Sequence, residues 1–165
     1  MGWLPDDKYY LDRGTFVHQA ISMYLSGTLD ESSLSEGVKP FVDSAIEYIT
    51  VSGYKPKHVE LSLHSPLFRY CGTLDAWPLL DWKTGGKEAW HVIQMSAYFF
   101  LAHENEITSF PMPMPLNVHL KNDGKLPKSE PYTLAQLLEA KKIFLSAIAC
   151  YQWRKQHKLI KEKSE

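Results

Sequence analysis

The chain has 165 residues, of which 44% are hydrophobic and 22% charged, enough for one folded domain with its own core and unlike a disordered segment. The formal net charge is −1, so binding of nucleic acid would need a local basic patch or metal ions rather than an overall positive field. Two cysteines without a CxxC pair exclude an iron–sulfur cluster and indicate a reduced, cytoplasmic protein with packed thiols, and no apolar run is long enough to span a membrane.

The first half of the chain predicts two helices followed by three strands. Apolar residues recur at helical spacing over 12–26 and 38–51, and Gly27 and the segment SGYKP end these two patterns. From residue 57 the spacing changes to an alternation that is typical of strands. We expect three short strands, in KHVELSLHS, LFRYCGTLDAW and PLLDWKT.

The second half predicts a helix over 87–104, a short strand in LNVHL, a hairpin-like turn in KNDGK and a long helix that begins near Thr133. We expect the tail after about Leu159 to fray. The order favours one α/β domain over 1–165, with a central sheet flanked by helices. The final helix carries an apolar stripe expected to pack on the sheet: Leu134, Leu137, Leu138, Phe144, Leu145, Ile148 and Tyr151.

Two carboxylates in GTLDAWPLLDWKTGG are unusual, because Asp is a poor strand former. Side chains at i and i+2 share one face of a strand, so Asp81 and Lys83 point the same way and Trp82 points to the other side. A tight hairpin around Trp77-Pro78 would bring Asp75 close to Asp81. Two ionised carboxylates repel unless a positive charge lies between them, and a divalent cation serves better than Lys83 alone. The alternative is a surface salt bridge beside a turn.

Four short motifs follow one another along the chain: RGTFVH with His18, GTLD with Asp75, LLDWKTGG with Asp81 and Lys83, and QMSAY with Gln94 and Tyr98. Together they resemble the RecB-type branch of the PD-(D/E)XK nuclease superfamily. The chain is also similar to free-standing phage exonucleases and to the mitochondrial genome maintenance exonucleases. The resemblance implies a restriction-endonuclease-like αβββαβ core with a central mixed sheet.

The resemblance also implies roles for single residues. Asp75, Asp81 and Lys83 would be the catalytic residues, with Lys83 positioning and activating the attacking water. Several members of the superfamily add an acidic residue of the first strand to the metal site, which is Glu60 here; the alternative is a carboxylate at a strand edge. One or two Mg²⁺ or Mn²⁺ ions would be held by His18, Asp75, Asp81 and the backbone carbonyl of Trp82.

Four further residues are candidates for contacts with DNA. Gln94 and Tyr98 lie one helical turn apart, and the resemblance implies that they touch the DNA backbone or orient the lysine. Arg69 and Thr84 are expected to contact the backbone, although exposed loop positions are the alternative. Trp90 and Trp82 are candidates for stacking on a base, although packing under the sheet is the commoner role for a residue such as Trp82.

The function expected from this resemblance is a metal-dependent DNA exonuclease that hydrolyses phosphodiester bonds at single-stranded or duplex ends in recombination, replication or repair. A structure-specific endonuclease on the same fold and a catalytically silent DNA-binding module are the alternatives. A recombination protein or single-strand-binding protein is a further candidate partner. The expected location is the cytoplasm, or the host cytoplasm for a phage-encoded protein, without a membrane.

One departure from the family pattern concerns the segment AWPLL between Asp75 and Asp81. Family members usually have a longer excursion there, and Trp-Pro is a poor replacement for the Gly, Asn or Asp of a two-residue hairpin loop. The sequence leaves open whether the turn is unusual or the hairpin is truncated. The mutual geometry of the two carboxylates depends on the answer.

Overall fold

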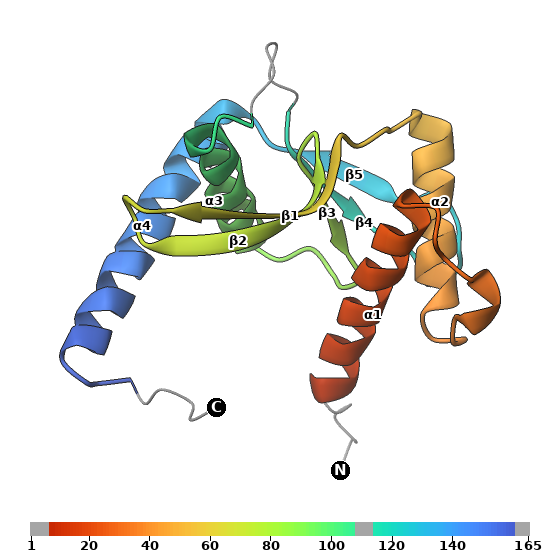
Figure 1. The fold of residues 1–165 in the computed structure, drawn as a ribbon, viewed down its shortest axis with the longest axis horizontal. Helices are drawn as coiled ribbons and strands as arrows, with labels where there is room; N and C mark the ends of the chain where they lie inside the picture. Colours follow the sequence, from red (N-terminus) through yellow and green to blue (C-terminus); the bar gives the residue numbers. More distant parts are fainter. Residues whose placement is uncertain (1–6, 108–113, 161–165) are drawn as a thin grey trace.

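The computed structural model describes residues 7–107 and 114–160, which form one five-stranded mixed sheet with helices on both sides (Figure 1). The strands follow one another across the sheet in chain order, and all neighbours are antiparallel except β3 and β4, which are parallel. Their bounds are β1 His58–Ser65, β2 Tyr70–Trp77, β3 Leu80–Lys83, β4 Leu116–His119 and β5 Lys128–Pro131.

The helices flank this sheet in two pairs, with α1 and α2 on one side and α3 and α4 on the other (Figure 1). This arrangement confirms the expected α/β class and is consistent with a restriction-endonuclease-like fold. Within the described part of the chain, no helix combines the length and apolar character needed to cross a membrane. The helix bounds are α1 Asp7–Leu25, α2 Lys39–Ser52, α3 His91–Glu104 and α4 Leu134–Gln156, with a short 3-10 turn, η1, at Glu31–Ser33.

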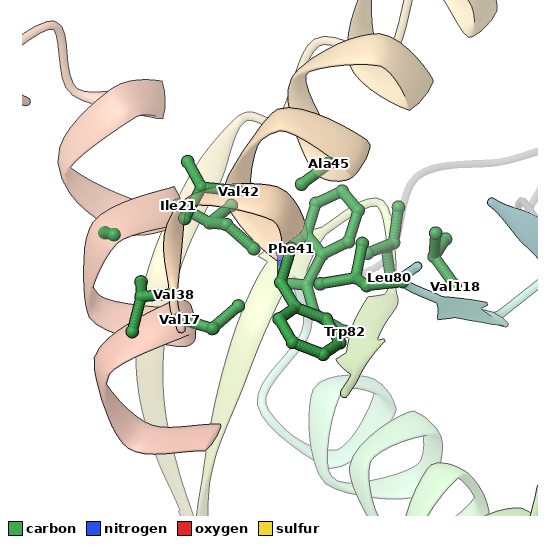
Figure 2. Close-up of a cluster of buried hydrophobic side chains, with 11 residues drawn as sticks. Val17, Ile21, Val38, Phe41, Val42, Ala45, Leu80, Trp82 and Val118 are labelled. Carbon is green, nitrogen blue, oxygen red and sulfur yellow. The ribbon is translucent and has the colours of Figure 1, made fainter. Parts of the chain in front are cut away.

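The core between the sheet and the first helix pair contains two side chains of β3, Leu80 and Trp82 (Figure 2). They pack against Val17 and Ile21 of α1 and against Phe41 of α2, and the indole is only 2% exposed. Because side chains alternate along a strand, this packing places Asp81 and Lys83 on the opposite face of the sheet. The burial of β3 therefore dictates the orientation of the carboxylate and the lysine discussed below.

A second core lies between the sheet and the other helix pair. Leu74 and Trp77 of β2 pack there with Met95 and Leu101 of α3 and with Leu137 of α4. The helix α3 is covered by the sheet on one side and by α4 on the other, so it is apolar around most of its circumference.

This sandwich corrects the expectation for the final helix. It begins as predicted, with Thr133 as N-cap in a capping box with Gln136, but α4 packs mainly on α3 and meets the sheet only in part, for example where Phe144 contacts Tyr70. Leu134, Leu138 and Tyr151 of the predicted stripe are consequently exposed. Periodicity shows that a helix has an apolar face, but it does not show which element covers that face.

The strand β5 was not predicted, and the reason is local. Its residues, Lys128 to Pro131, have no apolar alternation and include a proline, which suits only an edge strand. The prediction of packed thiols was also wrong, because Cys71 and Cys150 are both exposed. The helix α1 begins at least five residues earlier than expected, and α3 begins at His91 rather than near 87.

Candidate active site

A cleft of about 990 Å³ opens where α1, the end of β2, β3 and the start of α3 meet. Residues far apart in the sequence share it, and most of the candidate site residues are among them. The cleft is lined by His18, Asp75, Asp81, Trp82, Lys83, Thr84, Gln94 and Tyr98, together with Arg13, Trp90, His91 and five further residues.

The short turn between the two carboxylates holds them at the same cleft. Trp77 and Pro78 are joined by a cis peptide bond, and Ala76 of β2 pairs with Leu80 of β3 directly around the turn. The Tyr54 hydroxyl donates to the Pro78 carbonyl at 2.6 Å, which anchors the turn to the loop after α2. The Asp75 Oδ2 atom accepts a hydrogen bond from the backbone N–H of Trp82 at 2.9 Å. The hairpin is therefore short but intact, and its base carries both carboxylates.

Asp81 is nearly inaccessible, with 2% of its surface exposed. Its Oδ2 atom lies 2.5 Å from the Lys83 ammonium, an ion-pair contact, yet among the described residues it accepts no hydrogen bond of ordinary geometry. Burial, and then the negative charge of Asp75, raise the pKa of Asp81 to about 6, and the attraction of Lys83 offsets only part of this. The site thus holds more negative charge than its own lysine neutralises.

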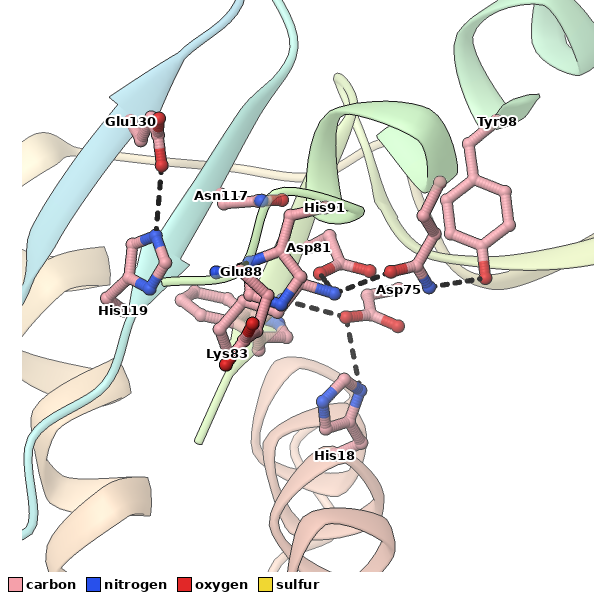
Figure 3. A network of polar contacts seen from close by, with 12 residues as sticks. His18, Asp75, Asp81, Lys83, Glu88, His91, Tyr98, Asn117, His119 and Glu130 are labelled. Carbon is pink, nitrogen blue, oxygen red and sulfur yellow. Dashed lines mark hydrogen bonds and ion pairs between the residues drawn. The ribbon is translucent and has the colours of Figure 1, made fainter. Parts of the chain in front are cut away.

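Lys83 is held by a chain of side chains that leads to α3 (Figure 3). Its Nζ donates to Gln94 Oε1 at 2.6 Å, and Gln94 Nε2 donates to the Tyr98 hydroxyl at 3.1 Å. The interpretation that Gln94 and Tyr98 orient the lysine therefore has a direct geometric basis. Asp81 and Gln94 hold the ammonium from the strand and the helix.

Gly72 of the GTLD motif makes this chain possible. A Cβ atom at this position would lie 2.8 Å from the Tyr98 ring, closer than Cβ contacts in real proteins. The glycine thus allows α3 to approach β2 closely enough for Tyr98 to support Gln94. The motif singled out Gly72, but only the tertiary contact explains why no side chain fits there.

His18 of α1 approaches the carboxylates from the other side of the cleft (Figure 3). Its Nδ1 atom is 3.1 Å from Asp75 Oδ2. Burial opposes a charge on the ring, but the hydrogen bond and charge of Asp75, together with the charge of Asp81, outweigh it and raise the pKa of His18. The imidazole therefore responds to the same excess of negative charge that Lys83 leaves unneutralised.

Glu60 lies beside this cluster. In the β1–β2 ladder it stands between Val59, which pairs with Ala76, and Leu61, which pairs with Leu74, so its position faces Asp75. Its backbone has a φ of +50°, in the left-handed region that non-glycine residues rarely adopt within a strand. Partial burial, and then the charge of Asp75, raise the pKa of Glu60. Glu60 is exposed and does not line the cleft itself; it lines a neighbouring hollow that shares His18 and Gly14 with the cleft.

The donor set suits a hard divalent cation, although it is not closed around one. Within residues 7–107 and 114–160, no three His, Cys, Asp or Glu side chains converge on a common point at metal-binding distance. Asp75 is engaged by His18 and by a backbone N–H, and Asp81 is engaged by Lys83. The buried Oδ2 of Asp81 without a hydrogen bond and the two adjacent carboxylates are what a cation such as Mg²⁺ or Mn²⁺ would stabilise. Binding of a cation would require the contacts of His18 with Asp75 and of Lys83 with Asp81 to lengthen.

The remaining candidates are divided between the cleft and the surface. The indole of Trp82 lies in the core, so the ring is not available for stacking on a base. Trp82 therefore borders the cleft with its backbone. Thr84 lines the cleft, and its carbonyl accepts a hydrogen bond from Arg13 at 3.3 Å. Arg69 lies in the β1–β2 turn, six residues from Asp75 along β2, or about 20 Å at roughly 3.3 Å per residue. It is not brought to the cleft.

A second group of polar side chains at the rim was not assigned from the sequence (Figure 3). His119 of β4 pairs with Glu130 of β5 at 3.3 Å, and its ring centroid lies 5.9 Å from that of His91. Burial, followed by the charges of Lys83 and His119, lowers the pKa of His91 to about 4, which keeps this ring neutral. Asn117 is buried on β4 opposite Asp81. These residues come from α3, β4 and β5, which meet beside β3 only in three dimensions, so sequence spacing carries no signal for them.

Comparison with known proteins supports the fold and leaves the family open. No protein-family model matches the chain, and no curated protein sequence matches it. Among solved structures, a crystal structure from Eubacterium rectale named "putative exonuclease" is similar, with a TM-score of 0.66 over 96% of this chain and 71% of that chain. The two sequences are 12% identical, a level at which the likeness is one of fold. The chain therefore has a nuclease-like fold, with a candidate site at the base of the β2–β3 hairpin.

Proposed function

We propose that this protein is a metal-dependent DNA exonuclease of the RecB-type branch of the PD-(D/E)XK superfamily. The observation that supports the proposal is the convergence of four elements on one cleft. His18 comes from α1, Asp75 from β2, Asp81 and Lys83 from β3, and Gln94 from α3. A single surface ion pair beside a turn does not require such an arrangement.

The proposed reaction is hydrolysis of a phosphodiester bond, which resists attack because its oxygens are anionic. One or two Mg²⁺ or Mn²⁺ ions would be held by Asp75 and Asp81, with His18, Glu60 and the Trp82 carbonyl as further donors. When bound, such an ion neutralises charge on the phosphate and lowers the pKa of a bound water. Because Asp81 is buried, its interaction with a cation would be only weakly screened by water.

Lys83 supplies the positive charge that belongs to the protein itself. An ammonium group has three N–H donors; one donates to Gln94, and the group is also in ion-pair contact with Asp81. A further N–H can donate to the attacking water or to a phosphate oxygen, while Tyr98 keeps Gln94 in place. This part of the mechanism is a matter of orientation, because the ammonium group is held before substrate arrives.

The proposed substrates are DNA ends generated in recombination, replication or repair, and a recombination or single-strand-binding protein is a proposed partner. A decisive experiment uses end-labelled single-stranded DNA, end-labelled duplex DNA and a closed circle, each with Mg²⁺, Mn²⁺ or EDTA. We expect metal-dependent shortening of linear DNA and an intact circle. Cutting of the circle would instead indicate an endonuclease, and activity in EDTA would contradict the metal mechanism.

Matched variants separate catalysis from folding. Asp81→Asn and Lys83→Ala remove the buried pair, whereas Asp43→Asn and Lys39→Ala remove a pair of the same two residue types on the surface of α2. We expect only the first two variants to lose activity. Folded wild-type protein that cleaves none of the substrates would be a catalytically silent module.

A further inference from the structure

A second cavity, of about 290 Å³, lies between β2, α3 and α4 and directly adjoins the candidate active site. We call it the aromatic groove. Its lining is mostly apolar, and four of its side chains are aromatic. Its apolar lining consists of Tyr70, Cys71, Trp90, Ile93, Ala97 and Phe144.

The groove presents ring surfaces but few hydrogen-bonding groups. The Tyr70 hydroxyl already donates to the Ala97 carbonyl at 3.0 Å, so the polar end of this side chain is satisfied within the protein. Its ring packs edge to face on Phe144, with centroids 4.9 Å apart. Trp90 is 53% exposed, unusual for the largest apolar side chain. Such a lining suits a flat partner with an apolar face and does not suit a phosphate group.

The groove is continuous with the candidate active site. Trp90, Gln94 and Tyr98 line both cavities. The Lys83 ammonium lies 5.3 Å from the centroid of the Trp90 ring, so one side chain borders both the proposed position of the scissile phosphate and the groove. A base attached to the nucleotide at Lys83 is therefore within reach of the Trp90 ring.

We propose that the aromatic groove receives an unpaired base of single-stranded DNA next to the phosphate that is cleaved. The proposal rests on the function proposed above for the position of that phosphate. Aromatic side chains stack on any base, so the groove would select for an unpaired strand rather than for a sequence. A base inside a duplex is already stacked and paired, and would have to leave its partner to enter.

The first test measures binding by fluorescence anisotropy in EDTA, where metal-dependent cleavage cannot occur. The probes are a labelled ten-nucleotide thymidine strand and the same backbone with abasic sites. We expect the strand with bases to bind about tenfold more tightly, and we expect Trp90→Ala to abolish this difference. Trp153→Ala is the matched control, because Trp153 is equally exposed on α4 but does not line the groove. Equal affinities, including no measurable affinity for either probe, would overturn the proposal.

The two cysteines provide a second test within one molecule. Cys71 lines the groove, whereas Cys150 lies on α4 outside it, and both thiols are free and exposed. We expect the thymidine strand to slow alkylation of Cys71 at least fivefold while Cys150 reacts at its original rate, as followed by mass spectrometry. Protection of Cys71 that rises with protein concentration in the absence of DNA would assign the groove to a second copy of the chain and overturn the proposal.

The two proposals fail in different ways. Base-dependent binding and Cys71 protection without cleavage of any DNA would support the groove and contradict the nuclease function. Metal-dependent cleavage that is equally fast on strands with bases and strands with abasic sites, and unchanged in Trp90→Ala, would support the nuclease and contradict the groove.

Discussion

Two lysine–aspartate pairs in this protein have similar contacts and very different surroundings. On α2, Lys39 and Asp43 lie one helical turn apart with 2.8 Å between Nζ and Oδ1, and their side chains are 48% and 39% exposed. On β3, Lys83 and Asp81 lie 2.5 Å apart, and their side chains are 11% and 3% exposed. An exposed pair contributes little because water and salt screen it, whereas a buried pair carries a desolvation cost that good packing alone would avoid.

The difference is what the proposed function predicts, because that function assigns the buried pair to the chemistry. Asp81 has a second carboxylate, Asp75, as neighbour, and its lysine is shared with Gln94. In the part of the chain that the structure describes, the only further charge that acts on Lys39 of the α2 pair is that of Glu31. Unbalanced charge in a cleft is typical of sites that bind a cation or an anionic substrate. The predictions below test whether the two pairs differ in function as much as in burial.

The largest effect is expected for the lysines. Lys83→Ala should lower the rate of DNA cleavage by about a thousandfold, because the positioned ammonium next to the phosphate is lost. Lys39→Ala should leave the rate within about twofold of wild type. Single-turnover cleavage with Mg²⁺ measures both. More than a tenth of wild-type activity in Lys83→Ala would show that the buried pair is structural.

A substitution at Gly72 should disturb the position of Lys83 indirectly, through Tyr98 and Gln94. Gly72→Ala would place a Cβ 2.8 Å from the Tyr98 ring, so the ring must shift and Gln94 loses its partner. We expect a loss of stability of about 1–3 kcal/mol by chemical denaturation and about a tenfold loss of activity.

Two controls accompany this variant. Gly86→Ala should not change stability, because its Cβ would meet no atom within 4 Å. In the Gly72→Ala background, Tyr98→Ala should cost less stability than it does alone, since removing the ring also removes the clash. Strict additivity of the two changes would contradict this explanation.

Asp81 is expected to reduce the stability of the metal-free protein at neutral pH. Burial and the charge of Asp75 raise its pKa from the ordinary value of 3.8 to about 6, so the folded state binds the proton more tightly than the unfolded state. The free energy of unfolding is therefore higher at low pH, and it falls as the pH rises from about 4 to above 6, where the folded protein must ionise the buried carboxyl group. Asp81→Asn should therefore stabilise the metal-free protein at pH 7 by roughly 1–2 kcal/mol.

Urea denaturation in EDTA at several pH values checks this sign. The advantage of Asp81→Asn should shrink as the pH is lowered from 7 to 4, while Asp43→Asn should give no gain at pH 7. A destabilised Asp81→Asn variant at pH 7 would mean that the attraction between Asp81 and Lys83 outweighs burial and repulsion.

The smallest effect is expected for the surface pair. Asp43→Asn should leave the denaturation midpoint unchanged at physiological salt, with at most a slight decrease at low ionic strength, because both side chains remain solvated without each other. Midpoints measured with and without added salt would reveal the difference. A large, salt-independent loss would remove the contrast between the two pairs.

The sequence by itself determined the features that depend on neighbours along the chain. Strand alternation placed Asp81 and Lys83 on one face and Trp82 on the other, and helical spacing placed Gln94 and Tyr98 together. The start of the last helix near Thr133 was likewise a local prediction. These predictions succeeded because each relates residues that are at most four positions apart, where backbone geometry alone dictates direction.

Only the tertiary structure decided which of these faces meet. It brought His18 to Asp75 across fifty-seven positions, placed Arg69 at the far end of the hairpin, and covered α3 so that the stripe of α4 is partly exposed. It also formed the aromatic groove from residues of β2, α3 and α4. The raised pKa of Asp81 has the same origin, since burial and the proximity of a second charge arise from packing between elements and leave no periodic trace in the sequence.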